Sequence, residues 1–292
     1  MSAYDRLYRF TFEKFPVRGE IVVLDASWKA VVDRHAYPAS VLDYLGQTLV
    51  AATLMSATIK LKGALIVQLQ GDGPLQTLVA QATDSRTLRG MARVADGAVP
   101  VVDDLHAALG NGRMVITAEA ANRERYQGIV AVEQATVAAA VEAYFAQSEQ
   151  LPTRLWLAAS TERAAGLLLQ RMPSAAAVDD DDWRRVCLFA DTLGRDELLD
   201  AGPETLLRRL FHEDDVRLFD PEPVAFRCSC SKSRIEDALR ALGQEEVDAI
   251  LRDQGAIEAD CEFCNAHYHF DAVDTAALFV DATPAQSPDA AQ

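Results

Sequence analysis

Apolar positions in the N-terminal part of the chain change period several times, and each change marks an expected helix or strand. A helical period runs from residue 40 to about residue 60, with Ser40 as candidate N-cap. Apolar runs separated by glycine and proline then predict strands at 64–70, 75–83, 87–94, 113–119 and 126–133. A helix at 135–148 and strands at 153–159 and 167–172 follow. Residues 1–177 are therefore expected to form a strand-rich core domain of α/β or α+β class.

The pattern changes after Pro173, where small residues lead into four aspartates at 179–182. Short helical stretches at 183–193, 197–199 and 204–211 are interrupted by Gly194 and by Gly202 and Pro203. Short, highly charged helices are marginal alone, so they need the rest of the protein to hold them. We predict a metastable helical linker over residues 178–225.

The segment from Phe226 onward has the pattern of a small compact unit. Ser233 and Glu236 have the spacing of a capping box and predict a helix to about residue 242. A second helix at 245–253 and strands at 256–260 and 267–270 complete the unit, which is too small to be stable without a crosslink or a metal. We assign residues 226–282 to this domain and 283–292 to a flexible tail. The predicted fold is α+β: a large sheet domain, a helical linker and a small C-terminal domain.

The formal net charge of -16 lies entirely in the last third of the chain. Residues 1–177 carry 17 basic and 17 acidic side chains, whereas residues 178–292 carry 11 and 27. Such a balance repels a phosphate backbone and argues against nucleic-acid binding. The N-terminus lacks the features of a secretory signal, and the long apolar stretch at 41–59 contains polar residues, so we expect a cytoplasmic protein without membrane partners.

Two closely spaced cysteine pairs carry the most specific chemistry: Cys228 and Cys230, then Cys261 and Cys264. Two such pairs on separate local turns are the usual way to assemble a tetrahedral zinc site from four thiolates. Structural disulfides are the competing interpretation, but a reducing cytosol opposes them. The fifth cysteine, Cys187, lies among apolar residues and is expected to be core.

The C-terminal cysteines and their histidine neighbours also allow alternative assignments. His267 and His269 could replace a thiol as ligand, although their alternation with Tyr268 and Phe270 suits a strand. A zinc-ribbon nucleic-acid binder and a thiol oxidoreductase using the second pair are the alternative functions.

Residues 71–74 predict a turn rather than a phosphate-binding loop, and no catalytic constellation is recognisable. Salt bridges or loop capping are expected for Arg18, Arg89 and Arg154.

The pattern CSC followed by CEFC resembles the redox-switch domain of the heat-shock protein 33 family, the redox-regulated holdase chaperones. The likeness extends over essentially the whole chain through the segments VRGE at 17–20, VQLQGDGP at 67–74, LRG at 88–90, RYQG at 125–128 and SEQLPTR at 148–154. The resemblance implies a non-enzymatic cytoplasmic chaperone of the oxidative stress response, inactive while reduced, with one zinc per chain on Cys228, Cys230, Cys261 and Cys264.

On oxidation the resemblance implies disulfides Cys228–Cys230 and Cys261–Cys264, zinc release, linker unfolding, homodimerisation and ATP-independent binding of unfolded client proteins. The position after Cys264, often glycine in such knuckles, is Asn265, which tolerates the left-handed conformation.

Overall fold

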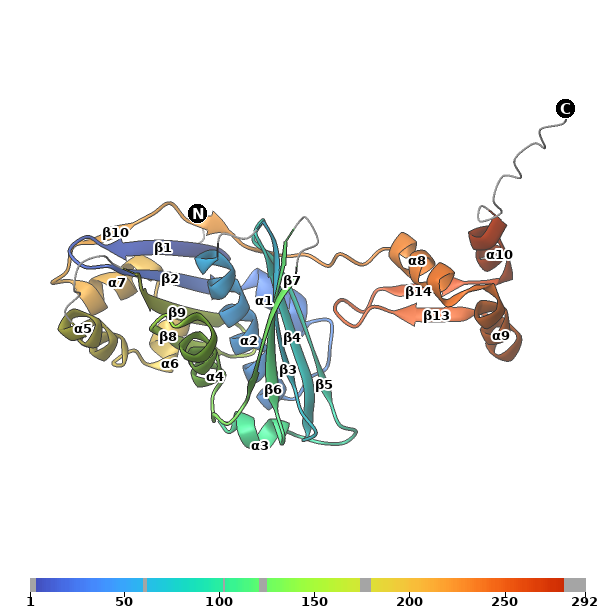
Figure 1. Ribbon diagram of the computed structural model, residues 1–292, viewed down its shortest axis with the longest axis horizontal. Helices are drawn as coiled ribbons and strands as arrows, with labels where there is room; N and C mark the ends of the chain where they lie inside the picture. Colours follow the sequence, from blue (N-terminus) through green and yellow to red (C-terminus); the bar gives the residue numbers. More distant parts are fainter. Residues whose placement is uncertain (1–3, 60–61, 102, 121–124, 174–179, 281–292) are drawn as a thin grey trace, which may run out of the picture. The chain divides into compact units, whose positions relative to one another are not determined.

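The computed structural model describes residues 4–59, 62–101, 103–120, 125–173 and 180–280 (Figure 1). The chain divides into an N-terminal unit of residues 1–227 and a C-terminal unit of residues 228–292. The predicted boundary at 177/178 and the predicted tail at 283–292 lie outside the described residues. The fold class is α+β, as predicted, because adjacent strands pair antiparallel with one exception.

Two six-stranded sheets build the N-terminal unit. Sheet A has the order β10-β1-β2-β9-β8, with β11 also on β1, and sheet B has the order β12-β5-β4-β3-β6-β7. The bounds in sheet A are β1 Arg6–Phe12, β2 Val17–Leu24, β8 Thr153–Ala159, β9 Ala164–Arg171, β10 Val216–Leu218 and β11 Glu222–Pro223. Those in sheet B are β3 Gly63–Gln70, β4 Leu75–Thr83, β5 Thr87–Val94, β6 Arg113–Ala120, β7 Arg125–Ala131 and β12 Ala225–Phe226.

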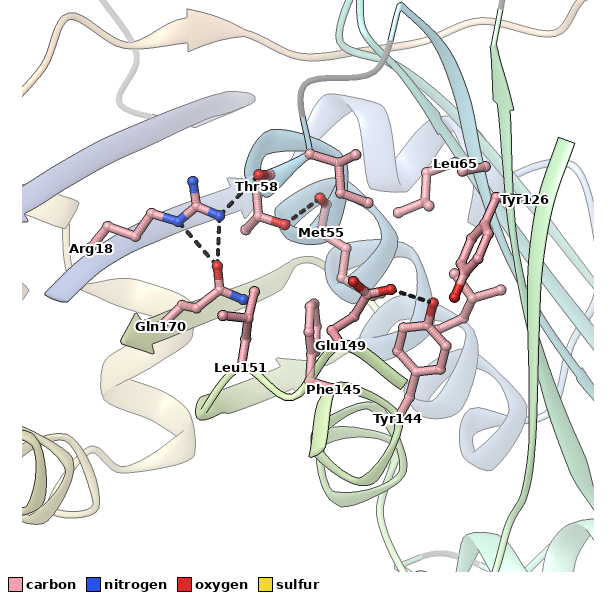
Figure 2. Close-up of a pocket in the computed structure, with 13 residues that line it drawn as sticks. Arg18, Met55, Thr58, Leu65, Tyr126, Tyr144, Phe145, Glu149, Leu151 and Gln170 are labelled. Atoms are coloured by element: carbon pink, nitrogen blue, oxygen red, sulfur yellow. Dashed lines mark hydrogen bonds between the residues drawn. The ribbon is translucent and has the colours of Figure 1, made fainter. Parts of the chain in front are cut away.

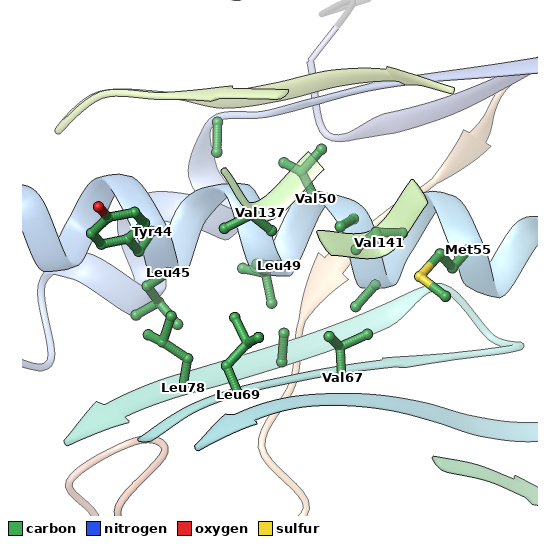
Figure 3. Packing of buried hydrophobic residues seen from close by; sticks show 14 of the residues in the cluster. Tyr44, Leu45, Leu49, Val50, Met55, Val67, Leu69, Leu78, Val137 and Val141 are labelled. Carbon is green, nitrogen blue, oxygen red and sulfur yellow. The ribbon is translucent and has the colours of Figure 1, made fainter. Parts of the chain in front are cut away.

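Helix α2 (Ala39–Thr58) lies between the two sheets and forms the centre of the main core (Figure 3). Fifteen of its twenty residues are buried, the pattern of a helix enclosed on every side. Leu49 faces sheet B, whereas Val50 packs against Gly166 of β9 in sheet A. The predicted N-cap is wrong: Pro38 occupies that position, and no side chain caps the helix.

Three short helices cover the other face of sheet A: α5 (Asp180–Ala190), α6 (Arg195–Asp200) and α7 (Pro203–Phe211). The Phe211 ring lies 6.2 Å from the ring of Phe10 and 5.0 Å from that of Phe12. Gly19 is opposite Phe10, and a Cβ there would come within 2.2 Å of the ring, so glycine lets Phe10 lie against the sheet.

We call this second core the linker interface. On the strand side and the adjoining turn it comprises Tyr8, Phe10, Phe12, Phe15, Val17, Ile21, Val23, Ala158, Ala165, Leu167 and Leu169. On the helices it comprises Val186, Ala190, Leu198, Leu199, Leu206, Leu207, Leu210 and Phe211. The central strands of sheet A are thus buried on both faces.

Several elements differ from the sequence expectation. The sequence pattern predicts no element before residue 40, where β1, β2 and α1 (Ala26–Val32) are found, and none at α3 (Leu105–Leu109). The linker is not helical throughout, because β10 to β12 pair with β1 and β5. The helix expected at 135–148 is α4 (Val137–Tyr144) followed by a π-helix, η1 (Phe145–Glu149).

Residues 71–74 form a structural turn, as predicted. Asp72 accepts hydrogen bonds from the backbone and the side-chain nitrogen of Asn111, both at 2.8 Å. A Cβ on Gly71 would lie 2.0 Å from the carbonyl oxygen of Leu109, so only glycine allows this close approach. The turn therefore holds the segment after α3 against the end of β3.

Glu20 on β2 is a buried carboxyl group, 2% exposed, whose Oε2 atom has no hydrogen-bond partner among the described residues. Burial raises its pKa to about 7, although Arg18, Arg9 and Arg86 act in the opposite direction. The unfolded chain loses this proton near the ordinary glutamate value, so the unfolded state ionises first as the pH rises. The stability that Glu20 contributes in its neutral form is therefore present at acid pH and lost as the pH rises through about 7.

We expect Glu20→Gln to remove this pH dependence. Between about pH 4.5 and about pH 8, the free energy of unfolding of the wild type should fall relative to that of the variant by about 3 kcal/mol. Urea titrations followed by tryptophan fluorescence measure it, because Trp28, Trp156 and Trp183 all belong to the N-terminal unit. Glu13→Gln, at an exposed position, is the control. Parallel stability curves for the wild type and Glu20→Gln would contradict the assignment.

Candidate metal centre

The four paired cysteines lie on two local turns of the C-terminal unit. Cys228 and Cys230 precede helix α8 (Lys232–Leu242), whose N-cap Ser231 accepts a hydrogen bond from the backbone N–H of Arg234. This corrects the sequence expectation that Ser233 begins the helix. Cys261 and Cys264 occupy the connection between β13 (Ile257–Asp260) and β14 (His267–Phe270), an antiparallel pair.

The hairpin turn is shaped by backbone hydrogen bonds to Cys261. Its carbonyl oxygen accepts from the backbone N–H of Cys264 at 3.2 Å and of Asn265 at 2.8 Å, and its own N–H donates to Ala266. Asn265 adopts a φ of 53°, the left-handed conformation that the sequence led us to expect. Asn265 therefore adopts the left-handed conformation for which glycine is the more usual residue. The turn presents both thiols of the pair together.

The four Sγ atoms come together, all within 4.8 Å of one another. Cys228 and Cys261 are 3.6 Å apart, and Cys230 and Cys264 are 3.3 Å apart. Four thiolates around zinc at about 2.3 Å have their sulfur atoms about 3.8 Å apart in a tetrahedron. The thiol set therefore has the donor chemistry and the size that a zinc ion needs, and within the described residues it is the one such group of at least three potential ligands.

Ionisation of the cluster becomes harder as charge accumulates. Burial opposes ionisation of Cys228, but hydrogen bonds from the Cys230 backbone and from the neighbouring thiols lower its pKa to about 7. Burial and the neighbouring thiols raise the pKa of Cys264 to about 12. Four adjacent thiolates repel one another, and a bound dication would compensate that repulsion.

Polar side chains near the thiols make two kinds of contact: Tyr268 contacts a sulfur atom, whereas the two histidines contact carboxylates at the surface. Tyr268 donates its hydroxyl hydrogen to Sγ of Cys230 at 3.2 Å, a contact that the sequence analysis missed although the alternation of β14 turns Tyr268 away from its histidine neighbours. His267 instead contacts Asp260 at 2.8 Å and Glu258 at 2.7 Å, and His269 contacts Glu258. Neither histidine belongs to the thiol group.

The remaining cysteine is isolated from this centre. Cys187 lies on α5 in the N-terminal unit and is 6% exposed. Burial raises the pKa of its thiol to about 12. A thiol in this state is a poor nucleophile, which agrees with the predicted core position.

The C-terminal unit that carries the four thiols has a small apolar core of its own. Its buried side chains are Leu239, Val247, Ile257, Phe270 and Leu278, contributed by α8, α9 (Gln244–Gln254), the hairpin and α10 (Ala272–Val280). A core of this size leaves a unit of about 50 residues short of independent stability. Bonds from four thiolates to one ion would link its two turns covalently.

Comparison with known proteins gives one consistent result. The family model described as "Hsp33 protein" matches residues 5–271. The "33 kDa chaperonin" of Nitrosococcus oceani is 53% identical over 96% of each chain, and that of Escherichia coli strain K12 is 42% identical over 98% of each. The crystal structure of the heat shock protein 33 homolog of Thermotoga maritima matches with a TM-score of 0.83 at 22% identity, covering 96% of this chain and 99% of that one.

Proposed function

Because this chain belongs to the heat-shock protein 33 family and is a chaperone rather than an enzyme, we propose that it is an ATP-independent holdase for unfolding proteins, switched on by oxidation of its four paired cysteines. The observation that carries this proposal is the linker interface, a broad apolar face of sheet A covered by three short helices. The proposed clients are unfolded or partly folded proteins, whose apolar segments would bind such a face when it is uncovered.

In the reduced state we assign one zinc ion to Cys228, Cys230, Cys261 and Cys264. The bound ion would keep the sulfurs as thiolates and the C-terminal unit folded. The clustering of the four Sγ atoms and the weakness of the unit's own core support this assignment. Cys261 and Cys264 are held by their turn, and Tyr268 steadies Cys230.

Oxidation would join the thiolates within each turn, giving disulfides Cys228–Cys230 and Cys261–Cys264. In each pair two thiolates give two electrons to one hydrogen peroxide molecule, which takes up two protons and leaves as two water molecules. Each disulfide removes two ligands, so zinc would be released. Disulfides within the turns leave the two turns unconnected, whereas disulfides between the turns would crosslink the unit. This pairing therefore agrees with unfolding on oxidation.

The linker is the segment that we expect to respond. Helices α5 to α7 have six to eleven residues each and depend on the sheet for their stability. After α7 the chain pairs with β1 and β5 and reaches Cys228 two residues beyond β12. We accordingly propose a chaperone core at 1–177, a linker at 178–225, a redox-switch domain at 226–282 and a tail at 283–292.

The same proposal covers assembly and location. The oxidised chain is expected to form a homodimer and to act in the cytoplasm, without nucleic-acid or membrane partners. In the described part of the chain, every helix is too short or too polar to cross a bilayer. The acidic balance of the last third supports the absence of a nucleic-acid ligand.

We expect hydrogen peroxide with mild heat to release one zinc per chain and to start suppression of client aggregation. Zinc is measured with a chromogenic chelator, aggregation by light scattering of a thermally unfolding client, and disulfide pairing by peptide mapping. Cys187→Ser should behave as the wild type in zinc release, because its thiol lies outside the cluster. Fully oxidised, zinc-free protein that never slows aggregation would refute the holdase proposal. Disulfides found mainly between the turns would refute the pairing.

A further inference from the structure

A cavity of about 560 Å³ lies within the N-terminal unit, away from the linker interface (Figure 2). Much of its lining is apolar and includes Met55, Leu65, Ile116, Phe145 and Leu151. Cavities of this size with a few placed polar groups are typical of small-molecule sites. The feature is separate from the four cysteines and has no part in the redox proposal.

Arg18 occupies one end of the cavity and is held in place by neutral groups. Its Nη2 atom donates to Oε1 of Gln170 at 2.6 Å and to the carbonyl oxygen of Thr58 at 2.9 Å, and its Nε donates to the same Oε1. Gln170 is fully buried, and its Nε2 donates to Oγ1 of Thr153 at 2.9 Å, which fixes the amide orientation. Arg18 therefore makes no salt bridge within the described residues, but its hydrogen bond to Thr58 caps the last carbonyl group of α2.

The charge of this arginine has no carboxylate partner at ion-pair distance within the described residues. Glu20 lies two positions along the same face of β2, but its Oε2 atom has no hydrogen-bond partner and it does not line the cavity. A half-buried guanidinium at the end of an apolar cavity is a site for a ligand carboxylate, which forms charge-assisted hydrogen bonds with such a group.

The opposite end of the cavity has different chemistry. Tyr126, Tyr144 and Glu149 gather there, and Tyr144 donates to Oε1 of Glu149 at 3.2 Å (Figure 2). Glu149 ends the π-helix η1, which supplies Phe145 to the wall, and π-helical turns are frequent at functional sites. An acidic side chain at this end disfavours a second negative charge on the ligand.

We propose that this cavity binds a small apolar monocarboxylate, such as a medium-chain alkyl carboxylic acid. The carboxylate pairs with Arg18, and the alkyl body lies along Met55, Leu65 and Phe145. One cation at one end and a carboxylate at the other select a monoanion over a dianion. The apolar wall between them selects an alkyl body over a polar one. Charge complementarity thus argues for this occupant over an uncharged apolar segment.

Calorimetric titration of the reduced, zinc-loaded full chain with decanoate tests the proposal, at concentrations below micelle formation. We expect saturable binding near one site per chain and about ten- to a hundredfold weaker binding of decan-1-ol, which lacks the charge. Arg18→Gln should lower decanoate affinity to the level of the alcohol. Arg113→Gln is the matched control, because Arg113 makes the same type of contact with Gln70 outside the cavity.

A second variant fills the cavity while leaving Arg18 in place. Ala118→Phe should abolish binding of both decanoate and decanol, so the test does not depend on correct folding of Arg18→Gln alone. Equal affinity for acid and alcohol, or unchanged decanoate binding in Arg18→Gln or in Ala118→Phe, would overturn the proposal. Tighter binding of a tetrapeptide with a free C-terminal leucine than of decanoate would overturn it too, since the occupant would then be a polypeptide end. All arms use reduced protein, so failure here leaves the redox proposal untouched.

Discussion

Serine at position 264 should leave the C-terminal unit without zinc and largely unfolded. The substitution replaces one thiolate of the cluster by a hydroxyl group that does not ionise at neutral pH, so three strong ligands remain. Structural zinc sites contribute about 10–16 kcal/mol of apparent binding free energy, and in a small unit this is folding free energy. Five buried apolar side chains do not replace it. We expect zinc per chain to fall from one to near zero, with loss of the helical signal of α8 to α10.

Zinc quantitation and far-UV circular dichroism measure the two effects on the same sample. Cys187→Ser is the matched control, because it removes a thiol from the N-terminal unit and should retain the metal. Tyr268→Phe should retain zinc as well, and the absence of its hydroxyl hydrogen bond to Cys230 is expected to hasten metal loss to a chelator. Full zinc content and an unchanged helical signal in Cys264→Ser would exclude Cys264 as a ligand.

The sequence predicts the clustering of the four cysteines well, because the positions that determine it are close together in the chain. Each cysteine pair lies within one turn, so spacing alone shows which thiols are presented together. The small size of the C-terminal unit indicates in addition that its apolar core needs a crosslink or a metal to make it stable. Sequence spacing cannot show which sulfurs of different turns are nearest. The 3.3 Å approach of Cys230 to Cys264 depends on how the hairpin packs against the start of α8.

Most strands of the two sheets were predicted from the sequence, but β1 and β2 were not. Strands β3 to β7 follow the predicted ranges to within two residues at each end. The signal is clearest for β3 and β4, which alternate between buried and less buried residues and are separated by the glycine- and proline-containing turn at 71–74. Strand β2 is buried on both faces and has no such alternation, and β1 was missed with it. The extended part of the linker was missed because β10 to β12 are two or three residues long and exist through pairing with β1 and β5.

Local signals also misplace helix ends when a neighbouring residue offers the same chemistry. Ser231 and Ser233 both precede the apolar stripe of α8, and the sequence pattern favoured Ser233 through Glu236. The structure uses Ser231, whose side chain reaches the backbone N–H of Arg234. The π-helix η1, which follows α4, has no recognisable signal in the sequence, yet it supplies Phe145 and Glu149 to the cavity. Tertiary packing decides both features.

Alanine in place of Phe211 should activate the chaperone without oxidation. Phe211 is 2% exposed and contacts Phe10 and Phe12 at the centre of the linker interface. Removing a buried phenylalanine side chain costs about 3–5 kcal/mol, and helix α7 has only nine residues to resist that loss. The core around α2 does not include Phe211, so undocking of the three helices is expected rather than global unfolding.

Reduced Phe211→Ala protein should therefore suppress client aggregation, bind an apolar dye and lose protease resistance between residues 180 and 218, while it retains one zinc per chain. Leu188→Ala is the matched control, because Leu188 lies on α5 in the same segment but is 59% exposed and should change none of these readouts. Zinc retention separates undocking of the linker from failure of the metal centre. If Phe211→Ala exposes the face of sheet A, as shown by dye binding and proteolysis, and yet leaves aggregation unchanged, the client surface lies elsewhere in the chain. Activity in this zinc-bound variant would instead assign client binding to the uncovered N-terminal unit and limit the four cysteines to control.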